Sequence, residues 1–166
     1  MKTWTRTAAA AAATAAILST AGLPATAASI NGATSLRVPL SGSLLTDAGS
    51  LNLTGTVHLV ILPVDPYYPG DPYEPTDPYR VQANLVNVRA TSPTLSCRAT
   101  GSQKFEVSGV DAVQTVDYRL EPLDPYVPAP GTCGGVEELN LRYEINFNDD
   151  GTITGVDVTP VGEILD

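Results

Sequence analysis

Several residue types that build catalytic and nucleic-acid-binding sites are scarce in this chain. Its 166 residues include one histidine, two cysteines and nine Lys or Arg, against eighteen Asp or Glu, for a formal charge of −9. Phosphate backbones bind basic surfaces, so this acidic balance predicts that the protein does not bind nucleic acid. One imidazole and two thiols leave little material for a catalytic dyad or a zinc site. We therefore expect a protein that is not an enzyme and has no resident cofactor, calcium being the one alternative considered below.

Long apolar runs are absent after the N-terminal segment. Residues 1–27 combine basic side chains at Lys2 and Arg6, an alanine-rich run and small residues up to Ala27, a pattern typical of a cleaved signal peptide. The apolar run is too short to cross about 30 Å of hydrocarbon. We predict cleavage after Ala27, with Ala28 as the next choice; the first leaves 28–166 as a single secreted β domain with no membrane insertion. Loss of the two cations changes the formal charge from −9 to −11.

The two cysteines are Cys97 and Cys133, an even number in a chain predicted to be exported. This favours a disulfide. By chain entropy alone, closing the intervening loop stabilises the folded state by about 3–4 kcal/mol. A catalytic cysteine would need a nearby histidine, and His58 is the only one in the chain.

Apolar and polar residues alternate along most of the chain, and Gly, Pro, Asn or Asp separate the alternating runs. This period of two is typical of strands with one buried face. The expected strands are 36–40, 50–62, 79–90, 94–100, 103–107, 112–120, 137–147 and 152–158. Between Leu85 and Val86 the apolar parity changes, which predicts a β-bulge. We predict an all-β fold: an antiparallel β-sandwich or small barrel of about eight strands, with long proline-rich loops between strands.

Prolines recur at every third residue from Pro63 to Pro78, and a shorter series with the same spacing runs from Pro122 to Pro128. Three residues per turn is the period of a polyproline II helix, which loses little conformational entropy on binding. Both series repeat Asp-Pro-Tyr, which would offer a partner aromatic rings and carboxylates. The candidate partner-binding residues are Asp65, Tyr67, Asp71, Tyr73, Asp77, Tyr79, Asp124 and Tyr126.

Two roles fit these proline-rich segments. In one, they bind an unknown extracellular protein or glycan; in the other, they are stiff connections without a partner. If both segments leave the same end of the sheet, they lie side by side.

Residues 146–157 resemble a degenerate EF-hand calcium loop. Asn146, Asn148 and Asp150 occupy its first, third and fifth positions, and Asp157 stands at the last position, where the family has Glu. The resemblance implies a calcium site at these four residues. The flanking residues alternate as in strands, where the family has helices, and this favours a β-hairpin with its turn at 148–151.

Motifs of common enzymes do not occur in the sequence: there is no Gly-x-Ser-x-Gly elbow, phosphate-binding glycine loop or zinc-ligand spacing. His58 lies on the polar side of its run, where no local motif supplies an orienting carboxylate and a nucleophile. The favoured hypothesis is a secreted, non-catalytic interaction or structural protein. A calcium-stabilised accessory domain is the second hypothesis, and a glycan hydrolase with paired carboxylates is the third.

Overall fold

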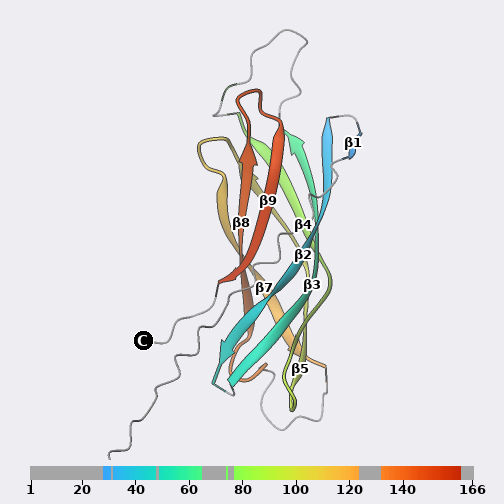
Figure 1. Ribbon diagram of the computed structural model, residues 1–166, viewed down its shortest axis with the longest axis vertical. Coiled ribbons are helices and arrows are strands. Elements are labelled where there is room, and N and C mark those ends of the chain that lie inside the picture. Colours follow the sequence, from blue (N-terminus) through green and yellow to red (C-terminus); the bar gives the residue numbers. More distant parts are fainter. Residues whose placement is uncertain are drawn as a thin grey trace, which may run out of the picture.

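The computed structural model describes residues 28–30, 32–47, 49–64, 74, 77–123 and 132–161. All regular structure in these residues is β-strand, and the strands pair antiparallel in one sheet. Figure 1 shows an elongated, twisted sheet that curls into a nearly closed barrel. The prediction of an all-β antiparallel fold is confirmed, in its barrel form. The predicted signal peptide lies outside the described residues, and no described segment is a helix long and apolar enough to span a membrane.

Nine strands make up the described sheet, whereas the sequence predicted about eight. They are β1 (Ala28–Ile30), β2 (Ala33–Thr46), β3 (Gly49–Pro63), β4 (Tyr79–Thr91), β5 (Ser96–Thr100), β6 (Ser102–Val107), β7 (Val113–Pro122), β8 (Glu138–Phe147) and β9 (Ile153–Val161). The short β1 was not predicted, and β2 extends well beyond the expected 36–40 at both ends. Pairing with β3 along its whole length explains this extension, because Ser, Gly and Pro in β2 give a weak local strand signal.

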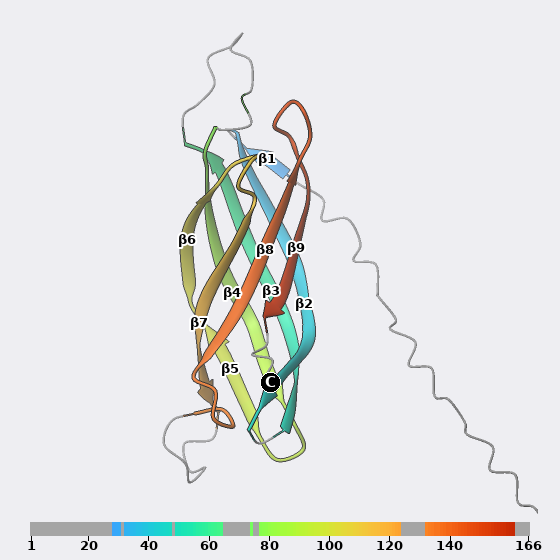
Figure 2. The same ribbon diagram turned by 90° about the vertical axis from the view of Figure 1, so that its left-hand side faces the viewer.

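The strand order is β1-β2-β3-β4-β5-β7-β8-β9, and β6 pairs with β4. Both β5 and β6 lie along the same edge of β4: β5 pairs with Val88–Thr91, and β6 with Tyr79–Asn84. Only β5 continues the ladder to β7, through pairs such as Cys97 with Pro122. Consequently, β7, β8 and β9 form a wall that faces β2, β3 and β4 across the barrel interior (Figure 2).

The sheet closes by contact between β2 and β9, without a ladder between the described parts of these strands. Each strand carries a proline, Pro39 in β2 and Pro160 in β9, and proline is tolerated at sheet edges because it has no N–H to donate. The contact is close: a Cβ added at Gly42 would lie 2.8 Å from Cγ of Pro160. Side-chain packing therefore holds this seam.

A β-bulge interrupts β4 where the apolar parity changes. Thr54 of β3 pairs with Arg89, but Thr56 pairs with Val86, so β4 carries one extra residue there. Within this stretch Asn87 has a φ of 53°, in the left-handed region. A bulge was predicted between Leu85 and Val86; the structure has one in this strand, but at Asn87–Val88, because Leu85 and Val86 still pair regularly with Val57 and Thr56.

The apolar faces of the strands fill the barrel interior. In β8, the alternate residues Leu139, Leu141, Tyr143 and Ile145 are all at most 1% exposed. The inward residues of β3 are equally buried: Leu51, Leu53, Val57, Leu59 and Ile61. The period of two therefore identified both the strands and their buried face.

Candidate functional site

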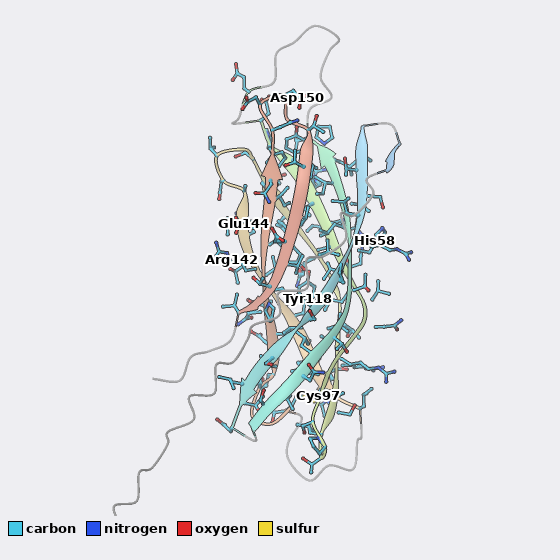
Figure 3. The ribbon with its side chains drawn as sticks, in the orientation of Figure 1. His58, Cys97, Tyr118, Arg142, Glu144 and Asp150 are labelled. Carbon is cyan, nitrogen blue, oxygen red and sulfur yellow. A yellow bond between two sulfur atoms is a disulfide. The ribbon has the colours of Figure 1, made fainter. Side chains whose placement is uncertain are left out.

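The two proline-rich segments connect strands at opposite ends of the barrel. One joins β3 to β4, and its base lies beside the β8–β9 turn, because Tyr79 bonds to Gly151. The other joins β7 to β8, and its base lies beside Cys97 at the start of β5. Figure 3 shows Asp150 near one end of the molecule and Cys97 near the other. The bases of the two segments therefore lie at opposite ends of the barrel, and sequence spacing alone did not indicate at which end each connection falls.

Hydrogen bonds close the base of the β3–β4 connection. The Val64 N–H donates to the Pro78 carbonyl at 3.0 Å. Just inside this pair, the Asp77 N–H donates to the Glu74 carbonyl at 2.9 Å, and the Glu74 N–H donates to Oδ2 of Asp77 at 2.9 Å. The Asp77 side chain, one of the predicted partner-binding groups, therefore also shapes the base, while Glu74 is exposed.

Tyr79 is a core residue. It is 7% exposed, its hydroxyl donates to the Gly151 carbonyl at 3.0 Å, and its ring centroid lies 5.0 Å from that of Phe147. This corrects its predicted place on a partner-binding surface, because a side chain buried and bonded in this way does not face a partner. The contact instead ties the first residue of β4 to the β8–β9 turn.

The other candidate partner-binding residues lie outside the described residues, so their assignment stays a prediction. They are Asp65, Tyr67, Asp71, Tyr73, Asp124 and Tyr126.

A disulfide fixes the base of the β7–β8 connection. It joins Cys97 to Cys133, whose Cα atoms are 6.1 Å apart and whose side chains are fully buried. The Leu123 N–H donates to the Ser96 carbonyl at 2.8 Å on the β7 side of the connection. Both ends of the connection are thus attached to β5.

The β8–β9 turn holds the residues of the EF-hand resemblance in a hairpin. The Gly151 N–H donates to the Asn148 carbonyl, and the Thr152 N–H donates to Oδ1 of Asp150 at 2.9 Å. Hydrogen bonds with Thr152 lower the pKa of the Asp150 carboxyl. One oxygen of this carboxylate is therefore already hydrogen-bonded within the turn.

The remaining two residues of the predicted calcium site lie along the strands. Asn146 stands opposite Gly155, and Asp157 stands opposite Glu144, farther from the turn. Within the part of the chain that the structure describes, no three His, Cys, Asp or Glu side chains gather in a group able to hold a metal ion. The hairpin alternative describes the local structure, and calcium binding there stays a prediction.

His58 lies on the outer face of β3, half-buried, with Arg37 and Asn84 beside it on the neighbouring strands. Its Nε2 is 3.0 Å from Oγ of Ser35. A serine next to a histidine is one part of a nucleophilic site, but no carboxylate among the described residues is bonded to this imidazole. The arrangement fits an ordinary surface histidine.

A groove of about 320 Å³ lies where β2, β8 and β9 end. Its lining contains two carboxylates but no imidazole or thiol. The lining residues are Leu44, Leu45, Gly135, Val136, Glu137, Glu138, Asn140 and Val161. This groove could not be predicted from the sequence, because its walls come from three separate segments.

A buried pair of tyrosines was also not predicted. Tyr118 of β7 and Tyr143 of β8 have hydroxyl oxygens 2.6 Å apart inside the barrel. Burial raises the pKa of both phenols. Tyr143 lies in the predicted strand 137–147, but its partner could be identified only from the register of the strands.

No protein-family model, curated protein or solved structure matches this chain.

Proposed function

We propose that this protein is a secreted, non-catalytic interaction domain that presents its two Pro/Tyr/Asp-rich connections to a protein or glycan outside the cytoplasm. The observation that carries the proposal is the fixed base of each connection. Val64 and Pro78 are hydrogen-bonded at the first base, and the Cys97–Cys133 disulfide holds the second. Anchoring both ends of a segment reduces the conformational entropy that it loses on binding.

The position of the bases supports two separate binding sites. The two bases lie at opposite ends of the barrel, so the two connections leave the barrel at different ends. A protein of this shape can contact two partners at once, or two parts of one extended partner. The proposal therefore assigns each connection its own site.

Substitution of two tyrosines tests the first connection. We expect Tyr67→Ala combined with Tyr73→Ala to abolish capture of a partner from the envelope fraction of the producing organism. The melting temperature should stay within about one degree of the original, because the proposal assigns both tyrosines to partner contact, and substitutions away from the core change stability little. Affinity capture with mass spectrometry and a thermal melt measure the two effects.

Tyr79→Ala and Tyr126→Ala are the controls. Tyr79→Ala should lower the melting temperature, since Tyr79 is buried against Phe147 and bonded to Gly151. Tyr126→Ala changes the connection at the other end and should leave capture by the first connection intact. Capture that survives both Tyr67→Ala and Tyr73→Ala at full strength would show that the first connection is only a structural link.

A further inference from the structure

The charges on the barrel strands are divided between its two halves. Strands β2–β6 carry five cations and one carboxylate: Arg37, Arg80, Arg89, Arg98, Lys104 and Glu106. Strands β7–β9 carry two cations and five carboxylates: Arg119, Arg142, Asp117, Glu121, Glu138, Glu144 and Asp157. An acidic protein with a formal charge of −9 thus has a basic half with a strand charge of +4 and an acidic half with a strand charge of −3.

These charges lie on the outer faces of the two halves. All five cations of β2–β6 are exposed, which leaves the apolar side chains of those strands to the interior. Figure 3 shows His58 of the basic half on one side of the molecule, and Arg142 and Glu144 of the acidic half on the opposite side. We call these surfaces the basic face (β2–β6) and the acidic face (β7–β9).

Each face contains two like charges directly opposite each other on paired strands. On the basic face Arg89 stands opposite Arg98, and on the acidic face Glu144 stands opposite Asp157. Like charges in this position destabilise a sheet. An external group of opposite charge would relieve the repulsion at both places.

One member of each pair has a counter-charge within the chain and the other has none among the described residues. Arg98 lies 3.7 Å from Glu121, and Arg142 lies 3.4 Å from Glu144. Arg89 and Asp157 form no ion pair with any residue that the structure describes. The Arg89–Arg98 pair thus offers one uncompensated cation, and the Glu144–Asp157 pair offers one uncompensated carboxylate.

We propose that copies of this protein associate side by side, with the basic face of one copy packed on the acidic face of the next. The Arg89–Arg98 pair of one copy then meets the Glu144–Asp157 pair of another. Because two different faces make this contact, the copy that uses its basic face keeps a free acidic face and its neighbour keeps a free basic face, so association continues from copy to copy. The contact uses the sides of the barrel, so it goes beyond the proposed function and does not depend on the connections at the ends.

The net negative charge opposes association only at long range. At about 0.1 M ionic strength the Debye length is about 10 Å, so repulsion between whole molecules is largely screened while contacts within a few ångströms persist. At about 1 M the Debye length is about 3 Å, and exposed ion pairs between copies are weakened as well. The association should therefore be present at moderate salt and disappear at high salt.

Sedimentation velocity of the purified protein at these two salt concentrations is the direct test. We expect species larger than the monomer at about 0.1 M NaCl and monomer alone at about 1 M. A wild-type protein that remains monomeric at both salt concentrations would overturn the proposal.

Two charge-reversed variants make the test specific. Arg89→Glu/Arg98→Glu removes the basic pair, and Glu144→Arg/Asp157→Arg removes the acidic pair. Each variant alone should be monomeric, and an equimolar mixture should associate, because each supplies the charge that the other lacks. Circular dichroism establishes that both variants are folded, and a mixture of folded variants that stays monomeric contradicts the assigned contact.

Two further measurements distinguish self-association from binding of an external polyanion and from the proposed function of the connections. If the wild type is monomeric but binds dextran sulfate, and Arg89→Glu/Arg98→Glu removes that binding, the basic face serves an external polyanion and self-association is wrong. The Tyr67→Ala/Tyr73→Ala variant should associate like the wild type, so failure of the proposed function leaves this result unchanged.

Discussion

At the scale of single residues, the buried tyrosine pair makes stability depend on alkaline pH. Burial raises the pKa of Tyr118 and Tyr143 in the folded protein, whereas an unfolded chain has ordinary phenols with a pKa of about 10. Above that pH the unfolded state binds fewer protons than the folded state, so the free energy of unfolding falls as the pH rises. We expect a steady loss of stability from about pH 10 upward, measured by urea unfolding at a series of pH values.

The variant Tyr118→Phe/Tyr143→Phe provides the comparison. It removes both ionisable groups together, so neither hydroxyl is left without its partner. Its free energy of unfolding should fall less steeply with pH than that of the wild type. Equal slopes would mean that the two phenols ionise as readily in the folded protein as in the unfolded chain.

Tyr79 shows why the Asp-Pro-Tyr repeat alone did not identify which of its tyrosines is buried. Tyr79 belongs to the same Asp-Pro-Tyr series as Tyr67 and Tyr73, and nothing in the spacing separates it from them. Its burial follows from its place as the first residue of β4, opposite Val107 of β6 and beside Gly151. The repeat itself does not mark this difference, whereas the predicted strand 79–90 began at Tyr79 and already conflicted with its place on a partner-binding surface.

At the scale of elements, alternation predicted strands well because one face of each strand is buried. It also indicated a bulge in β4, though about two residues before its actual position, since an extra residue reverses which side chains point inward. It could not give the strand order. The consecutive strands β6 and β7 do not form a ladder with each other, and β6 lies beside β4 instead. Such pairing depends on how the whole sheet curls.

Gly55 allows β3 to pass the bulge of β4. A Cβ at this position would lie 2.7 Å from Cα of Val88, a backbone atom that cannot move independently. We expect Gly55→Ala to lower the free energy of unfolding by about 1–3 kcal/mol, as in other overpacked sites. Urea unfolding measures the loss.

Gly42→Ala is a matched control in the neighbouring strand. Its added Cβ would meet Cγ of Pro160, a side-chain atom at the β2–β9 seam, which can shift more easily than backbone. The loss should therefore be smaller than for Gly55→Ala. A larger loss at Gly42 would show that the seam is packed more rigidly than the β3–β4 ladder.

At the scale of the whole molecule, the disulfide joins the two halves of the barrel. Cys97 belongs to β5 on the basic side, and Cys133 precedes β8 on the acidic side, 36 residues later in the chain. Only the ladder between β5 and β7 connects these halves by hydrogen-bonded strand pairing in the described residues. A covalent bond beside this ladder adds a second connection between the halves, besides the packing at the β2–β9 seam.

Cys97→Ala/Cys133→Ala should lower the free energy of unfolding by about 3–4 kcal/mol, since the unfolded chain is no longer constrained by the closed loop. Urea unfolding of the oxidised wild type and of the variant measures the difference. The wild type treated with dithiothreitol should unfold like the variant, which separates loss of the bond from loss of the sulfur atoms in the core. If the reduced wild type keeps the stability of the oxidised form, packing at the β2–β9 seam and the β5–β7 ladder already holds the halves together without the bond.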